Sequence, residues 1–108
     1  MDNKEAIRHK NDVFRTSFTG GSVILTSGVQ SSENLDKILN AVRCFDDFNE
    51  DNDPWKEHDF GAVMLDSEKY FWKIDYYENS DCEYGFAFED DKPDTSYRTL
   101  TVMLTSEY

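Results

Sequence analysis

The sequence predicts an α+β fold in which about two helices pack on one face of a four-stranded, mainly antiparallel sheet. Two observations support this class: an apolar stripe with helical spacing in the first half of the chain, and strands with one apolar face in the second half. Such one-sided alternation is typical of antiparallel sheets that leave a face to solvent. With 108 residues, the chain is expected to form a single compact domain over residues 1–108, in which residues 1–18 can form a peripheral helix.

The first half of the chain predicts a helix, a strand and a second helix. Residues 3–17 can form a helix that ends before a Gly-Gly pair, since paired glycines break helices. The β-branched run within residues 22–26 predicts a short buried strand. Ser31 or Ser32 can cap the second helix, whose apolar side chains recur at i, i+3, i+4, i+7 and i+10. These side chains are Leu35, Ile38, Leu39, Val42 and Phe45.

The second half of the chain predicts three strands. Residues 60–65 and 69–77 flank a short polar turn and are expected to pair as a hairpin. Residues 99–105 alternate in the same way and form the last strand. The predicted order is therefore helix, strand, helix and three strands, with the helices on one side of the sheet.

Composition excludes several classes of protein. The chain carries 11 basic and 23 acidic side chains, a net charge of −12, which excludes the usual nucleic-acid binder because phosphate contacts need an excess of Lys and Arg. The longest aliphatic run is only 62–65, and residues 1–10 are charged where a signal peptide is apolar. The two cysteines lack metal-ligand spacing. We therefore expect a cytoplasmic protein that uses no cofactor and contacts neither membranes nor nucleic acid directly.

The acidic excess lies wholly in the second part of the chain. Residues 1–45 carry six basic and five acidic side chains, whereas residues 46–108 carry five and eighteen. Most of these acids fall in two stretches, which we call the first acidic segment (46–59) and the second acidic segment (78–94). Their carboxylates are the predicted partner-binding residues. They are Asp46, Asp47, Glu50, Asp51, Asp53, Glu57 and Asp59 in the first segment and Glu78, Asp81, Glu83, Glu89, Asp90, Asp91 and Asp94 in the second.

The first acidic segment begins with two carboxylates at a position where an anion is unfavourable. Asp46 and Asp47 fall at the C-terminal end of the predicted second helix, where the helix dipole disfavours an anion by roughly 0.3–1 kcal/mol. A neighbouring cation such as Arg43 could compensate. Segments that break local rules without compensation are often functional, so this cluster is a candidate for binding a basic partner.

The acids also allow two other readings. They can simply keep the protein soluble, because exposed charge prevents association. A calcium loop starting at Asp47 fails, since its twelfth position is His58 where a bidentate Glu is required. A metal-binding or metal-assisted hydrolase module stays open as an alternative, with an imidazole placed among carboxylates. Its ligands would be Asp53, Glu57, His58 and Asp59.

Four stretches of the sequence resemble a known bacterial family. They are FTGGSVILTSGV (18–29), FDDFNEDNDPWKEHDFGA (45–62), FWKIDYY (71–77) and LTVMLTSEY (100–108). Together they are similar to the family called domain of unknown function 3768, and 45–61 is the most specific part. The resemblance implies no activity and no catalytic residue. It implies a setting, because such small proteins look like cargo of plasmids and prophages.

The leading hypothesis is a non-enzymatic inhibitor of mobile-element origin. Its carboxylates would mimic phosphates on the basic nucleic-acid-binding surface of a bacterial defence effector. The most concrete form is an anti-CRISPR. An anti-restriction protein and a general protein-interaction domain are further alternatives.

Overall fold

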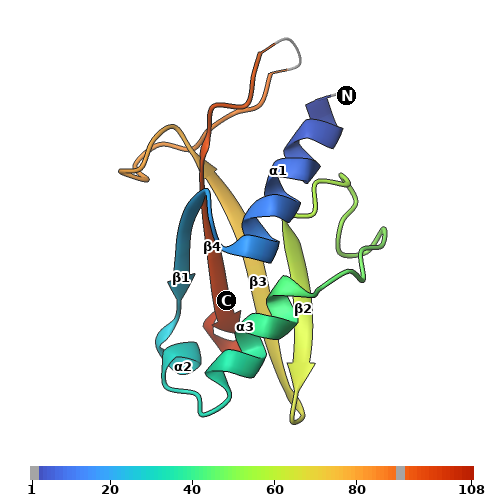
Figure 1. Cartoon of the computed structure of the whole chain (residues 1–108), viewed down its shortest axis with the longest axis vertical. Helices are drawn as coiled ribbons and strands as arrows, with labels where there is room; N and C mark the ends of the chain where they lie inside the picture. Colours follow the sequence, from blue (N-terminus) through green and yellow to red (C-terminus); the bar gives the residue numbers. More distant parts are fainter. Residues whose placement is uncertain (1–2, 90–91) are drawn as a thin grey trace.

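A four-stranded sheet forms the centre of the fold (Figure 1). The computed structural model describes residues 3–89 and 92–108, and the strands lie in the order β1-β4-β3-β2. The hairpin of β2 and β3 is antiparallel, as is the pairing of β3 with β4, whereas β1 and β4 are parallel. The prediction of a mainly antiparallel sheet is confirmed, and the parallel edge makes it a mixed sheet. The strands are β1 (Gly21–Leu25), β2 (Phe60–Leu65), β3 (Glu68–Tyr77) and β4 (Tyr97–Leu104).

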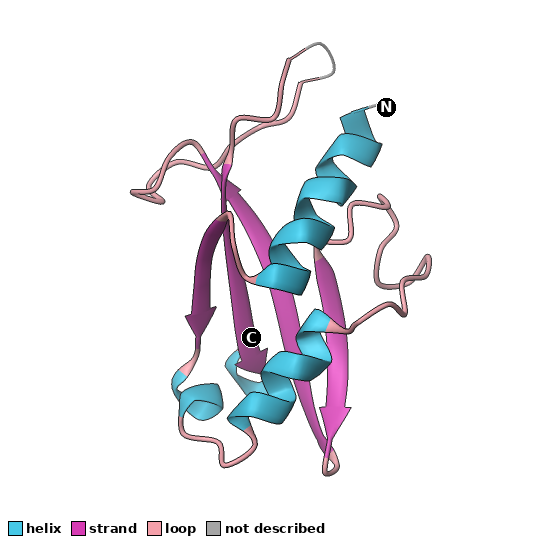
Figure 2. Ribbon diagram, viewed as in Figure 1, coloured by secondary structure: helices cyan, strands magenta, loops and turns pink. Residues whose placement is uncertain are grey.

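Two helices lie across one face of this sheet (Figure 2). They are α1 (Asn3–Ser17) and α3 (Leu35–Arg43), as the sequence predicts. A one-turn helix, α2 (Ser27–Gln30), and a 3-10 helix over Thr105–Glu107 were not predicted, because elements this short show no periodicity. No helix in the described ranges is long and apolar enough to cross a membrane.

The second helix begins later than the serine caps predict. Its first residue is Leu35, and Asn34 takes the N-cap position. Ser31 instead closes α2, since its backbone N–H and its hydroxyl both donate to the Ser27 carbonyl oxygen, at 3.1 and 2.9 Å. Ser32 accepts the N–H of Asn34 at 3.1 Å. Both serines therefore shape the connection before the helix.

The core lies between the helices and the sheet. Phe14, Ile38 and Val42 of the helices meet Trp72 and Leu100 of the strands, and each of these side chains is at most 2% exposed. Burying one such side chain stabilises the fold by about 1.5–3 kcal/mol. The alternation in β3 and β4 is thus the sequence signature of this interface.

Gly61 leaves room for the Trp72 side chain. The two residues are register partners in the β2–β3 hairpin. A Cβ atom at position 61 would lie 2.5 Å from the indole Nε1 of Trp72. Only glycine fits at this point of the strand without moving the tryptophan.

Both acidic segments leave the sheet at the same end. The first segment runs directly into Phe60, the first residue of β2, which pairs with Lys73 in the middle of β3, and β3 continues from there to Tyr77. The second segment connects Tyr77 to Tyr97, which pair with each other where β3 ends and β4 begins. In Figure 1 the first segment (green) lies beside α1, and the described part of the second (orange) extends beyond the strands. The turn between β2 and β3 marks the opposite end.

Candidate functional site

The carboxylates of the two acidic segments divide into an exposed set and an engaged set. The exposed ones are Asp46, Asp47, Glu50, Asp51, Glu78, Asp81, Glu83 and Glu89. The engaged ones, which are buried or half-buried and contact other side chains or backbone, are Asp53, Glu57, Asp59 and Asp94. Asp90 and Asp91 lie outside the described residues. The sequence could not separate these two sets.

The exposed half of the first segment is shaped by two asparagines. Asn49 Oδ1 accepts the backbone N–H groups of Asp51 and Asn52, at 2.9 and 3.2 Å. Asn52 in turn accepts the N–H of Asn49 at 3.0 Å and donates to the carbonyl oxygen of Asp47 at 2.8 Å. These bonds satisfy the backbone locally, so the neighbouring carboxylates are left to face solvent.

Arg15 compensates the carboxylates at the end of α3. Its guanidinium, 4% exposed, donates to the carbonyl oxygens of Val42 (3.1 Å), Arg43 (3.2 Å) and Phe45 (2.8 Å). A cation bonded to the last carbonyls offsets the helix dipole that disfavours Asp46 and Asp47. Arg43 also lies in the last turn of α3, where a cation offsets the dipole, and its guanidinium lies over the Phe18 ring, 4.2 Å from the centroid.

Asp53 and His58 fasten the first segment to α1. Asp53 Oδ1 accepts the N–H groups of Glu57 and His58, both at 3.1 Å. The imidazole of His58 has Nδ1 2.9 Å from Asp12 of α1 and Nε2 3.6 Å from Asp53. Its ring stacks on Phe48, with centroids 3.7 Å apart and planes 2° from parallel. Both ring nitrogens therefore face carboxylates.

Glu57 and Asp59 face a different partner. The hydroxyl of Tyr76 lies 3.4 Å from Glu57 Oε2 and 3.2 Å from Asp59 Oδ2, and it accepts a 2.8 Å hydrogen bond from Asn11. Burial, reinforced by the negative charge of Asp59, raises the pKa of Glu57 above its usual range. Burial likewise raises the pKa of Asp59, and it raises the pKa of the Tyr76 hydroxyl strongly.

The predicted metal ligands are thus split between two clusters. Asp53 and His58 face Asp12, whereas Glu57 and Asp59 face Tyr76. Within residues 3–89 and 92–108, no three His, Cys, Asp or Glu side chains come together in a way that could hold a metal ion. The described residues therefore give the metal-assisted alternative no ligand set.

The engaged part of the second segment is held by Arg98. Its guanidinium forms an ion pair with Asp94 and donates to Ser96 Oγ at 3.0 Å and to Asn11 Oδ1 at 2.6 Å. Although burial alone would raise it, the hydrogen bonds from Arg98 and Ser96 hold the pKa of Asp94 below its usual value. The second segment is thus joined to α1 through Asn11.

Tyr76 and Asn11 link the two acidic segments. Tyr76 contacts Asp59 of the first segment through its hydroxyl, and its ring packs edge-on against Phe88 of the second segment at 4.7 Å. Asn11 donates to the Glu57 carbonyl oxygen at 2.9 Å and accepts from Arg98. The engaged residues of both segments therefore belong to one connected cluster.

The residues that build this cluster could not be identified from the sequence. Asn11, Asp12, Arg15, Tyr76 and Arg98 were not among the candidates. One signal was present in α1. Its buried stripe runs through Ile7, Asn11, Phe14 and Arg15, so two polar residues interrupt an apolar face. A polar residue on such a face needs a buried partner and is a reason to look for one.

The chain matches none of the curated proteins and none of the solved structures with which it was compared. The family described as "Protein of unknown function (DUF3768)" matches residues 25–107. This range runs from the last residue of β1 to the 3-10 helix and includes both acidic segments. It confirms the resemblance found in the sequence, and the chain belongs to this family.

Proposed function

We propose that this protein binds a basic surface of another protein through the exposed carboxylates of its two acidic segments, and thereby excludes nucleic acid from that surface without catalysing a reaction. One observation carries the proposal. Both segments leave the same end of the sheet, and they hold exposed carboxylates that form no ion pair with any described cation. These carboxylates are Asp46, Asp47, Glu50, Asp51, Glu78, Asp81 and Glu83.

The density of charge is comparable with that of a nucleic acid. A DNA strand presents a phosphate about every 3.4 Å along its axis. Residues 46–51 carry four exposed carboxylates. An extended chain of that length would span at most about 20 Å, or one charge per about 5 Å, and the asparagine turns shorten this span. A basic groove that accepts phosphates could therefore pair with several of these carboxylates at once.

The contacts that hold the first acidic segment in place also favour binding. Its engaged half is fixed by Asp53, His58 and the Tyr76 cluster, and its exposed half by the two asparagine turns. A surface that is ordered before binding loses less conformational entropy when a partner docks. This supports a recognition surface more than a purely solubilising tail, which would need no such anchoring.

The narrower form of the proposal is an anti-CRISPR, in which the partner is the basic groove of a CRISPR effector. An anti-restriction protein would act in the same way on a DNA-cleaving enzyme. Both forms predict competition with nucleic acid, and they differ only in which purified effector is inhibited.

The test measures displacement of labelled DNA from a purified CRISPR effector and from a purified restriction enzyme. We expect the wild-type chain to displace DNA from one of them. The inhibition constant should increase as the salt concentration is raised, because salt weakens the binding of charged surfaces. Reversal of Asp47, Glu50 and Asp51 to lysine should weaken this inhibition at least about tenfold.

A matched control reverses three exposed acids at the opposite end of the molecule, Glu33, Asp36 and Glu68. Asn34 donates to Asp66 at 3.1 Å, which places the start of α3 beside the β2–β3 turn, so these three acids lie away from the acidic segments. The control changes net charge equally and should leave inhibition almost unchanged. If both variants lost inhibition equally, inhibition would depend only on net charge and not on these carboxylates. If the wild-type chain displaced no DNA at all, the proposal would be overturned.

A further inference from the structure

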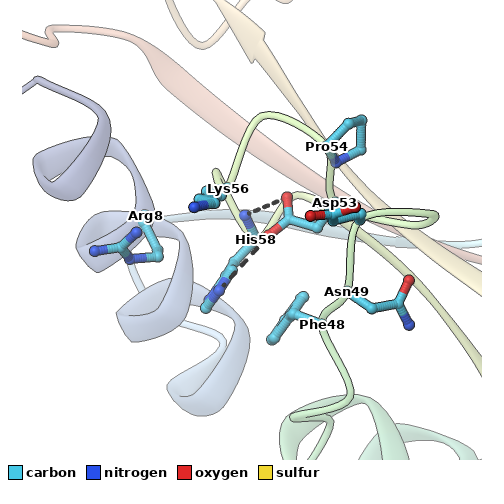
Figure 3. A pocket seen from close by; sticks show the side chains of 8 residues that line it. Arg8, Phe48, Asn49, Asp53, Pro54, Lys56 and His58 are labelled. Carbon is cyan, nitrogen blue, oxygen red and sulfur yellow. Dashed lines mark hydrogen bonds and ion pairs between the residues drawn. The ribbon is translucent and has the colours of Figure 1, made fainter.

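A pocket of about 780 Å³ lies between α1 and the first acidic segment (Figure 3). Arg8 of α1 lines one side of it, and Phe48, Pro54, Lys56 and His58 line it from the facing loop. Small-molecule sites commonly measure roughly 300–1,000 Å³ and combine apolar walls with a few polar groups. The pocket has both properties.

Its two cations are unusual in this chain. Of the 11 basic side chains, eight contact a carboxylate, a backbone carbonyl or an aromatic ring. The other three, Arg8, Lys37 and Lys56, form no hydrogen bond, ion pair or ring contact through their side chains with the described residues. Arg8 and Lys56 line the same pocket. In a chain with 23 acidic side chains, two unpaired cations at one pocket are available for an external anion.

The buried carboxylate that lines the pocket, Asp53, forms no ion pair with Arg8 or Lys56. Asp53 has a side chain that is 4% exposed, and its Oδ1 atom accepts the N–H groups of Glu57 and His58. Its Oδ2 atom faces His58 Nε2 at 3.6 Å. Glu50, which also lines the pocket, is exposed to solvent, where a carboxylate attracts neighbouring cations only weakly.

The backbone is strained where it presents the loop side chains. Lys56 and His58 have φ values of 58° and 56°, in the left-handed region that L-residues with side chains rarely adopt. The two hydrogen bonds to Asp53 Oδ1 fix this conformation. Strained residues that are held by their surroundings cluster at ligand sites. The strain here coincides with the wall of the pocket.

We propose that this pocket binds a small organic anion. Its phosphate or carboxylate group lies between the Arg8 guanidinium and the Lys56 ammonium, and its apolar body lies against Phe48 and Pro54. This site does not depend on the proposed binding of a basic protein, because it uses cations and the other surface uses carboxylates. Glu50 is the residue that the two share, since it lines the pocket and belongs to that surface.

The test follows backbone amide shifts of the ¹⁵N-labelled chain during titration with phenyl phosphate, with benzoate and with neutral benzyl alcohol. We expect saturable shifts around Arg8, Lys56 and His58 with at least one anion, and much weaker binding of the alcohol. Preference for phenyl phosphate or for benzoate distinguishes a phosphate ligand from a carboxylate ligand.

The variants Arg8→Gln and Lys56→Gln should each weaken anion binding at least about tenfold, which is the loss of one charge-assisted contact. Lys37→Gln is the matched control, because it removes the third unpaired cation from a site outside the pocket. It should leave the affinity unchanged. Absence of saturable shifts with both anions, equal binding of the alcohol, or equal weakening by Lys37→Gln would overturn the proposal.

Discussion

The Nδ1 atom of His58 lies 2.9 Å from Oδ1 of Asp12, and this contact ties the first acidic segment to α1. We expect His58→Ala to lower the free energy of unfolding by about 1–3 kcal/mol, because Asp12 and Asp53 lose a partner and Phe48 loses its stacked ring. Urea unfolding measures the change. His9→Ala is the control, since that exposed residue of α1 should cost less than about 0.5 kcal/mol. An equal effect of both substitutions would show that the contact contributes no stability.

Arg15 should be the most costly basic residue of α1 to replace. Arg15→Met removes the Arg15 donor from three carbonyl oxygens at the end of α3, of which only that of Val42 keeps another donor among the described residues, the Phe45 N–H, so we expect a loss of about 3 kcal/mol. The matched variant Arg43→Met removes a cation over the Phe18 ring and should cost less than about 1 kcal/mol. Thermal and urea unfolding distinguish the two. If Arg43→Met were the more costly change, the capping role assigned to Arg15 would be wrong.

Glu57 should make stability depend on pH. Its pKa is raised in the folded state, so the folded protein holds this proton more tightly than the unfolded chain does. The resulting stabilisation is fully present below the unfolded-state pKa and is lost as pH rises through the folded-state pKa. Glu57→Gln should therefore increase the free energy of unfolding at pH 7, and this gain should shrink as the pH is lowered toward the unfolded-state value. A gain that does not change with pH would contradict the assignment.

Asp94 should make stability depend on pH in the opposite direction to Glu57, as measured by the free energy of unfolding. Its pKa is lowered in the folded state, so its contribution to stability is present above the unfolded-state pKa and is lost as the pH falls through the folded-state pKa. Asp94→Asn should destabilise the protein at pH 7, and the difference from wild type should narrow in acid. The two variants therefore shift stability in opposite directions at neutral pH.

Gly61→Ala tests the packing of the β2–β3 hairpin. The added methyl group would lie 2.5 Å from Trp72 Nε1, so we expect a loss of about 1–3 kcal/mol and a change in tryptophan fluorescence. Gly85→Ala is the control, because the nearest atom to its new methyl group is 3.9 Å away. Similar stability of the two variants would mean that Trp72 moves without cost.

The regular elements could be predicted from the sequence because their patterns are local. The alternation in β3 and the apolar stripe of α3 each lie within about ten consecutive residues. The 3-10 helix could not be predicted in this way, because its Glu107 accepts hydrogen bonds from Thr26 at 2.6 Å and from the N–H of Gly28 at 3.0 Å, far away in the sequence.

The candidate site could be predicted only in part, because many of its contacts join residues that are far apart in the sequence. The sequence identified the acidic segments, but it could not indicate which carboxylates would be engaged. Asp59 is half-buried because Tyr76 meets it, and Asp94 because Arg98 does. Asn11 and Arg98 are 87 residues apart and still share a hydrogen bond, so local patterns could not reveal this contact.

The parallel pairing of β1 with β4 has a consequence for synthesis on the ribosome. Gly21 pairs with Arg98 and Leu25 with Val102, and β4 is the neighbour of β1 in the described sheet. While the chain is being made, β1 has no strand partner until β4 leaves the ribosome, and β4 follows the β2–β3 hairpin and the second acidic segment in the sequence. Pairings between distant parts of a chain form slowly and leave strand edges open to wrong contacts meanwhile. The nascent protein therefore depends on late synthesis of β4 to close its sheet.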